Sequence, residues 1–206
     1  MFELLQRMGS AVCHQMAERS FIFDGMQMPL CARCTGIYTG VFLAFCFFFL
    51  KKRMGNSKPF SMPQTILTAA AVLPVGIDGA GSYLGFWESS QFLRILTGSI
   101  VGAVLPGFLL LAGNFEPDGK NEAALYEKTT ELLLLMLVSV GFGFCLLAGM
   151  PVHWIGAVFS VAGEVLLWGG ILWLLMKNIL KKEMPYWRIS VLVSFVVLFL
   201  IGGLIS

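Results

Sequence analysis

The stretch that decides the fold is Pro29-Leu-Cys-Ala-Arg-Cys-Thr-Gly-Ile-Tyr-Thr-Gly40, which leads without a break into the apolar run 41–50. A proline suits the first turn of a helix, because the N–H that it lacks would have no helical partner there. The run ends at three basic residues, 51–53. Since a helix needs about 20 apolar residues to cross a bilayer, residues 31–50 are predicted to form a membrane-spanning helix with two thiols at its N-terminal mouth.

The composition of the whole chain is that of a membrane protein. Of its 206 residues, 57% are hydrophobic and only 13% are charged, whereas soluble domains carry about 25% charged residues. Five more apolar segments predict an all-α fold, a polytopic membrane helix bundle with about six transmembrane helices in residues 31–206. The second span is expected to be interrupted by Pro74 and by Gly76-Ile-Asp-Gly79. The five segments cover roughly residues 63–83, 92–112, 132–150, 154–176 and 187–205.

Residues 1–30 precede the bundle and mix apolar with polar side chains. This segment is expected to be an amphipathic helix on the membrane surface, because its apolar residues recur at helical intervals. A turn around Asp24-Gly25 is expected to follow and to lead into the first span. The apolar positions are Phe2, Leu5, Met8, Val12 and Met16.

The basic residues are unevenly divided between the two ends of the predicted bundle. The loops after the first, third and fifth spans hold ten of them, and the other side holds four. Because cytoplasmic loops carry an excess of lysine and arginine, the thiols and both termini are expected on the non-cytoplasmic side of the cell membrane. The ten are Lys51, Lys52, Arg53, Lys58, Lys120, Lys128, Lys177, Lys181, Lys182 and Arg188, and the four are Arg7, Arg19, Arg33 and Arg94.

Two of the spans share a pattern of small residues. Gly36-x-x-x-Gly40 in the first span is similar to Gly98-x-x-x-Gly102 in the third, at the same end of two helices that run in the same direction. Glycines four residues apart let helix backbones approach closely. Close helix packing is the simpler interpretation, and an internal duplication is the alternative.

The strongest candidate site combines Cys13 and His14 with Cys31 and Cys34. Three thiolates and one imidazole match a tetrahedral zinc site, and Cys-x-x-Cys is the usual half of such a site. Adjacent ligands such as Cys13 and His14 point in different directions along a helix, so one of them alone could bind. The pattern therefore predicts a zinc ion at the membrane face.

Two other interpretations of the thiols stay open. Cys31 and Cys34 at a helix N-terminus could act as a redox dithiol, with the thiolate stabilised by the helix dipole and by Arg33, and with the upstream cysteine shuttling the disulfide. A structural disulfide or inert thiols is the third possibility. Cys46 and Cys145 lie inside apolar runs and are expected to pack as small hydrophobic residues.

Two carboxylates fall within predicted spans, where an ionised group is costly and usually functional or paired. Asp78 is expected near the same face as the thiols, with Arg94 as its partner, either as a structural ion pair or as part of a site. Glu164 lies midway along the fifth span, has no partner in the sequence, and is either a protonated packing residue or a functional one. His153 is expected to be an ordinary surface residue.

Two blocks of the sequence resemble the family called domain of unknown function 2085. The first block is Cys13-His-Gln15, Arg19-Ser-Phe21 and Pro29-Leu-Cys-Ala-Arg-Cys-Thr-Gly-Ile-Tyr38, and the second is Asp78-Gly79, Leu93-Arg94 and Thr97-Gly98. The family comprises small predicted membrane proteins, so the resemblance implies no established activity. It implies that one site contains Cys13, His14, Cys31, Cys34, Asp78 and Arg94.

These observations predict a metal site beside an outward-facing pocket lined by Asp78 and Arg94. With three protein ligands, zinc could activate water, with the aspartate as general base and the arginine as anion clamp, in a hydrolase acting on an amphiphilic or lipid-linked substrate. One alternative is a membrane thiol–disulfide oxidoreductase that passes electrons from Cys31 and Cys34 to a quinone. The other is a non-enzymatic protein that binds or transports a small molecule. The net charge of +2 is too small to indicate a nucleic acid partner, and the bilayer is the expected surroundings.

Overall fold

The computed structural model describes residues 2–180 and 187–205, and six of its helices are long and apolar enough to span a membrane. Each begins within three residues of its predicted start, so the prediction of a six-span bundle is confirmed. The predicted interruption of the second span is wrong, because that helix continues through Pro74. The spans are α2 (Ala32–Leu50), α3 (Met62–Tyr83), α4 (Gln91–Asn114), α5 (Thr129–Leu147), α6 (His153–Leu180) and α7 (Trp187–Ile205).

The helix in the N-terminal segment is shorter than the spacing of its apolar residues predicts. Helix α1 (Phe2–Gly9) ends well before Met16, and a 3₁₀ turn, η1 (Ala17–Arg19), leads to an antiparallel hairpin of β1 (Ser20–Phe23) and β2 (Met26–Cys31). The predicted turn is confirmed: Asp24 and Gly25 have φ values of 50° and 76°. This left-handed conformation suits a two-residue hairpin turn.

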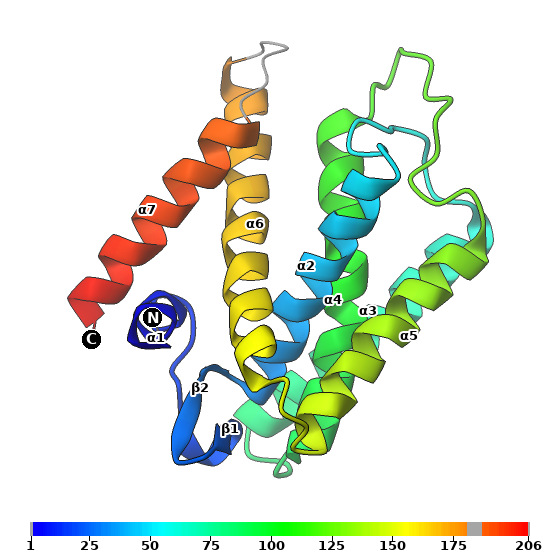
Figure 1. Ribbon diagram of the computed structural model, residues 1–206. Coiled ribbons are helices and arrows are strands. Elements are labelled where there is room, and N and C mark those ends of the chain that lie inside the picture. Colours follow the sequence, from blue (N-terminus) through cyan, green and yellow to red (C-terminus); the bar gives the residue numbers. More distant parts are fainter. Residues whose placement is uncertain (1, 181–186, 206) are drawn as a thin grey trace.

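Helix α1 ends where it meets the hairpin. A Cβ atom on Gly9 would lie 2.4 Å from the carbonyl oxygen of Pro29, so only glycine lets the chain come this close to β2. The N-terminal segment is therefore a short helix and a hairpin folded together over one end of the bundle (Figure 1).

The centre of the bundle is the contact between α2 and α4. A Cβ on Gly102 would lie 2.0 Å from the carbonyl oxygen of Ile37, and one on Gly40 would lie 2.8 Å from the backbone nitrogen of Ala103. The glycines of both helices thus lie at the close contact that their pattern predicts. In the most apolar 18-residue stretch of α4, 61% is buried inside the protein, whereas only 22% of the corresponding stretch is buried in α3 and in α7. Helices α3 and α7 are therefore the outer, lipid-facing helices.

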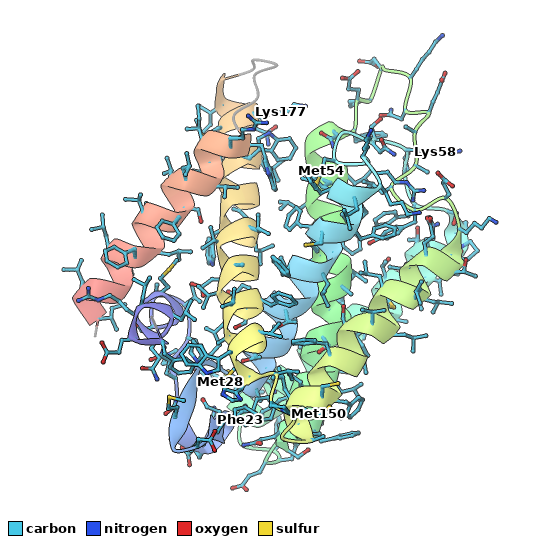
Figure 2. The ribbon with its side chains drawn as sticks, viewed as in Figure 1. Phe23, Met28, Met54, Lys58, Met150 and Lys177 are labelled. Atoms are coloured by element: carbon cyan, nitrogen blue, oxygen red, sulfur yellow. The ribbon has the colours of Figure 1, made fainter. Side chains whose placement is uncertain are left out.

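The loops gather at two opposite ends of the bundle (Figure 1). We call one the thiol end: it holds both termini, the hairpin and the short α3–α4 and α5–α6 connections, and Phe23, Met28 and Met150 mark it in Figure 2. The other, which we call the basic end, holds the α2–α3 and α4–α5 loops, and Lys58 and Lys177 mark it. Eight of the ten basic residues that the sequence grouped together lie at the basic end, and Lys181 and Lys182 lie outside the described residues.

Candidate metal centre

Three cysteines from three different elements meet at the thiol end. Cys13 lies in the loop after α1, Cys31 ends β2 and is the N-cap of α2, and Cys34 is in the first turn of α2. Their sulfur atoms all lie within 4.8 Å of one another. Cys13 is buried and the other two are half-buried, and all are free thiols. The predicted approach of Cys13 to the Cys-x-x-Cys pair is confirmed.

Two glutamines hold the loop of Cys13 against the hairpin. The Gln15 side-chain amide donates to the carbonyl oxygens of Gln6, at 2.6 Å, and Pro29, at 2.7 Å. The Gln27 amide in turn donates to the Gln15 carbonyl oxygen at 2.5 Å. Nothing in the residue types marks these glutamines as parts of a site, although Gln15 directly follows Cys13-His14 in the sequence. They position Cys13 over the start of α2.

The surroundings of the cluster favour a thiolate at one of the three sulfur atoms, that of Cys31. The backbone N–H of Cys31 donates to the sulfur of Cys13 at 3.3 Å. Hydrogen bonds from the thiols of Cys13 and then Cys34 lower the pKa of Cys31 below that of an ordinary thiol. The guanidinium of Arg94 is only 6% exposed and lies within electrostatic range of Cys31. Among the described residues it has no salt bridge to a carboxylate, so its charge is free to offset negative charge on sulfur.

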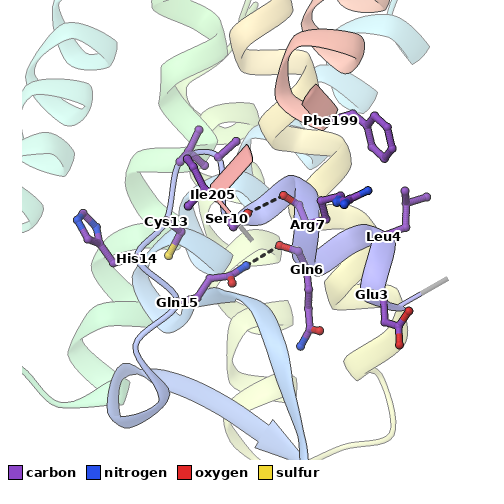
Figure 3. A pocket seen from close by; sticks show the side chains of 12 residues that line it. Glu3, Leu4, Gln6, Arg7, Ser10, Cys13, His14, Gln15, Phe199 and Ile205 are labelled. Atoms are coloured by element: carbon purple, nitrogen blue, oxygen red, sulfur yellow. Dashed lines mark hydrogen bonds between the residues drawn. The ribbon is translucent and has the colours of Figure 1, made fainter. Parts of the chain in front are cut away.

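His14 lies apart from this cluster. Its side chain is exposed, and Figure 3 shows its ring directed away from the sulfur of Cys13. Neighbouring side chains of an extended loop project to different sides, so burying Cys13 turns His14 outward. The structure therefore brings together three of the four predicted ligands.

The cluster borders a large open pocket of about 1120 Å³ between the N-terminal segment and the end of α7 (Figure 3). Cys13, His14 and Gln15 form the wall nearest to the cluster. A metal held by the three sulfurs would thus lie beside a space that solutes can enter. The remaining walls are Glu3, Leu4, Gln6, Arg7, Ser10, Ala11, Val12, Phe199 and Ile205.

Asp78 is buried at the same end, but its partner is not the predicted one. Its carboxylate forms an ion pair with Arg33 of α2 and accepts hydrogen bonds from the Ser89 hydroxyl, at 2.9 Å, and the Trp87 indole, at 3.5 Å. Arg94 instead donates to the Ser89 carbonyl oxygen at 3.0 Å and to the Ser82 hydroxyl at 3.3 Å. The predicted Asp78–Arg94 pair is therefore wrong, because the guanidinium of Arg33 occupies the position beside the Asp78 carboxylate. Neither residue lines the pocket beside Cys13.

The other residues singled out in the sequence lie outside the cluster. Glu164 is 0% exposed in α6, and neither carboxyl oxygen has a hydrogen-bond partner. Cys46 and Cys145 are half-buried within α2 and α5. His153 stacks on Phe23 of the hairpin, with ring centroids 5.2 Å apart, so it helps to hold β1 on the bundle.

Comparison with known proteins agrees with this picture. A family model described as "Predicted membrane protein (DUF2085)" matches residues 13–108. An uncharacterized protein of Methanothermobacter thermautotrophicus is 37% identical over 91 residues, which cover 44% of this chain and 78% of that protein. The chain belongs to the DUF2085 family. It is a multi-pass membrane protein with a three-cysteine cluster that could hold a metal ion.

A second relative is an uncharacterized protein of Methanocaldococcus jannaschii, 37% identical over 101 residues, or 49% of this chain. The chain spans less than two thirds of that protein, 63% of its length. No solved structure matches the chain. The DUF2085 match contains the three cysteines, Asp78 and Arg94, whereas Glu164 lies beyond it.

Proposed function

We propose that this protein binds a zinc ion through Cys13, Cys31 and Cys34 at one face of the membrane. The observation that carries the proposal is the mutual approach of the three sulfur atoms to within 4.8 Å. Zinc–sulfur bonds of about 2.3 Å in tetrahedral geometry put sulfurs about 3.8 Å apart. Small side-chain movements are therefore enough to close the site on a metal.

The charges and donors around the cluster support the same proposal. A divalent ion with three thiolates carries one net negative charge. The buried Arg94 cation lies within range of Cys31 to offset that charge, and the Cys31 N–H donates to a ligand sulfur. Such outer contacts orient and stabilise metal ligands.

The proposed zinc has two consequences for the protein. It fastens the loop of Cys13 to the start of α2 and thereby holds the N-terminal segment on the bundle. A zinc site with three protein ligands would keep a fourth position for water or a small molecule, and the pocket that Cys13 lines would give such a molecule access to the cluster. We propose the non-cytoplasmic side for this face, from the basic residues at the opposite end.

Hydrolysis by Asp78 and Arg94 stays a prediction, and the geometry supports metal binding better than catalysis. The Asp78 carboxylate already accepts from Arg33, Ser89 and Trp87, which occupy three of the about four acceptor sites of a carboxylate. A general base needs a free lone pair directed at the water that it deprotonates. We therefore propose a zinc protein that binds a small ligand at the open position.

Metal analysis of the intact protein tests the proposal. Protein purified in detergent without chelator is expected to contain one zinc per chain by mass spectrometry of the metal. Cys13→Ser, Cys31→Ser and Cys34→Ser are each expected to lose it. Cys46→Ser and Cys145→Ser are matched controls, since these half-buried thiols lie outside the cluster, and both should keep the metal.

The redox alternative makes the opposite prediction in the same samples. A dithiol that serves a quinone would be found without metal and with a disulfide between two of the three cysteines. Counting free thiols in the unfolded protein, before and after reduction, distinguishes the two. A metal-free protein with one reducible disulfide would overturn the zinc proposal.

A further inference from the structure

A second hollow, an apolar groove, lies between α6 and α7 next to the pocket beside Cys13. Its volume is about 320 Å³, which falls within the range of roughly 300–1,000 Å³ of small-molecule sites. The α7 residues that line it recur at helical intervals on one face, and the two α6 residues lie one turn apart. The α7 residues are Val193, Ser194, Val197, Leu198 and Ile201, and the α6 residues are Trp168 and Leu172.

The groove is apolar and opens toward the bilayer. The hydroxyl of Ser194 donates to the carbonyl oxygen of Val165 at 3.1 Å, so its proton is already used within the protein. Val193 and Val197 are 41% and 43% exposed, although both lie in a helix that is long and apolar enough to span the membrane. An exposed side chain inside a span faces lipid and not water. An acyl chain is therefore the apolar group that reaches this groove.

The length and direction of the groove fit one leaflet of the bilayer. From Val193 to Ile201 a helix rises about 12 Å, at about 1.5 Å per residue. The hydrocarbon of one leaflet is about 15 Å thick, half of the ~30 Å core. Helix α7 ends at the thiol end, so Ile201 lies nearer to this end than Val193 does (Figure 1). The groove thus runs from the thiol end into the membrane, as an acyl chain of that leaflet does.

The groove and the pocket share a wall. Ala11 and Val12, in the loop after α1, line both of them. Figure 1 shows α1 between the end of α7 and α6, and α1 contacts both helices. Because Cys13 follows these two residues and lines the pocket, the pocket extends from Cys13 to the mouth of the groove. One elongated molecule can therefore have its polar end beside Cys13 and its apolar end between α6 and α7.

Arg7 supplies a cation to the polar part of this site. It lines the pocket, and its guanidinium lies 5.5 Å from the centroid of the Phe199 ring. Glu3 also lines the pocket, but Figure 3 shows its carboxylate directed away from that guanidinium. Among the described residues no carboxylate forms an ion pair with Arg7. Since a guanidinium matches the geometry of phosphate oxygens, this part of the pocket favours a phosphate group.

We infer that the groove and the pocket form one binding site for a phospholipid of the thiol-end leaflet. One acyl chain lies between α6 and α7, and the phosphate lies at Arg7. The headgroup then lies beside Cys13, so the inference names the class of ligand for the open position of the zinc, and in that respect it rests on the proposed function. Binding of the lipid itself uses apolar contacts and Arg7, which need no metal.

Native mass spectrometry of the protein in detergent tests the groove. The probe is dioleoylphosphatidylglycerol. Val197→Trp fills the groove and is expected to weaken binding of the probe roughly tenfold, which corresponds to about 1.4 kcal/mol. Val196→Trp is the matched control and should bind as the wild type does, because Val196 is 52% exposed on the same helix but does not line the groove.

A second probe tests the phosphate. Dioleoylglycerol has the same acyl chains without the phosphate, and wild-type protein is expected to bind it roughly tenfold more weakly, as loss of a hydrogen bond to a charged group predicts. Arg7→Gln should bind both probes equally, and because both are measured on the same variant, the ratio does not depend on how much of it is folded. Arg19→Gln is the control, since Arg19 is exposed at the thiol end but does not line the pocket.

The outcomes separate this inference from the zinc proposal. Equal effects of Val197→Trp and Val196→Trp, equal binding of the two probes by wild-type protein, or a dimer that binds neither probe would overturn the inference. Zinc content is measured in the same samples. Zinc without lipid binding would overturn the lipid site alone, whereas lipid binding without zinc would overturn the metal centre alone.

Discussion

The two ends of the bundle are held together in different ways. At the basic end the buried Arg53 forms ion pairs with Glu127, at 2.6 Å, and Glu131, at 2.7 Å. It also donates to the Leu125 carbonyl oxygen at 3.1 Å. At the thiol end, amide hydrogen bonds and three sulfur atoms hold the N-terminal segment.

This difference shows which end depends on a ligand. Arg53 joins the α2–α3 loop to the start of α5 with protein groups alone, and all of its partners are present in the chain. The sulfur atoms at the thiol end have no comparable set of partners, and a metal would supply it. We therefore expect the thiol end, and not the basic end, to loosen when metal is removed.

Chelation is expected to have the largest effect. A metal present at a thousand times its Kd stabilises the folded state by about 4 kcal/mol. Its removal should expose the N-terminal segment to trypsin at Arg19, whereas cleavage at Lys120, which is also an exposed residue but lies at the basic end, should keep its rate. Loss of only about 1.4 kcal/mol of local stability already accelerates cleavage tenfold. Time courses with and without a zinc chelator measure both sites.

Zinc added back should restore the slow rate at Arg19. Protein with Cys31→Ser should be cleaved quickly at Arg19 in either condition. Equal acceleration at both sites would mean that the chelator destabilises the whole bundle, and that the contrast between its ends is wrong.

The basic end is expected to respond to the loss of a charge instead. Arg53→Met leaves Glu131 without its cation in a partly buried place, and breaking such a pair costs about 3 kcal/mol. The midpoint of thermal unfolding should fall, while the zinc content stays at one per chain. Lys51→Met, at an exposed neighbouring position, is the control and should change neither. Loss of zinc in Arg53→Met would show that the two ends are coupled.

The two ends also differ in how far their structure could be predicted from sequence. Spans are set by length and hydropathy, so their number and starts followed from the pattern alone. The hairpin did not, because apolar residues of the N-terminal segment happen to recur at helical intervals through Met16. The signal for it was Asp24-Gly25 between apolar residues, the dipeptide of a tight hairpin turn. The contact between Gly9 and Pro29, which ends α1, is tertiary and has no local signal.

The site shows the same limit. The cysteines themselves were enough to predict that Cys13 joins Cys31 and Cys34, since thiolates gather as ligands around one zinc ion. The partner of Asp78 depends on how α2 and α4 are rotated about their own axes. A hydropathy pattern in two nearly all-apolar helices does not specify that rotation, so the sequence predicts Arg94 as the partner, whereas the structure has Arg33.

The glycine contact is expected to link helix packing to the thiol end. A Cβ on Gly98 would lie 2.5 Å from the carbonyl oxygen of Arg33, directly before Cys34. Gly98→Ala should therefore destabilise the bundle by about 2 kcal/mol, as overpacking does, and should speed zinc loss to a chelator. Gly141→Ala in α5 is the control: no atom lies within 4 Å of the added carbon, and alanine favours a helix by up to about 1 kcal/mol. Thermal unfolding and chelator competition measure the two effects.

The smallest effects are expected from two buried carboxyl groups, whose comparison separates a paired group from an unpaired one. Asp78→Asn removes the charge that Arg33 and two other donors contact and should cost about 1–3 kcal/mol. Glu164→Gln breaks no hydrogen bond, since neither oxygen has a partner, so its effect on unfolding should stay within about 0.5 kcal/mol. Thermal unfolding of both variants in the same detergent gives the ranking. A larger loss in Glu164→Gln would mean that its carboxyl group has a stabilising contact.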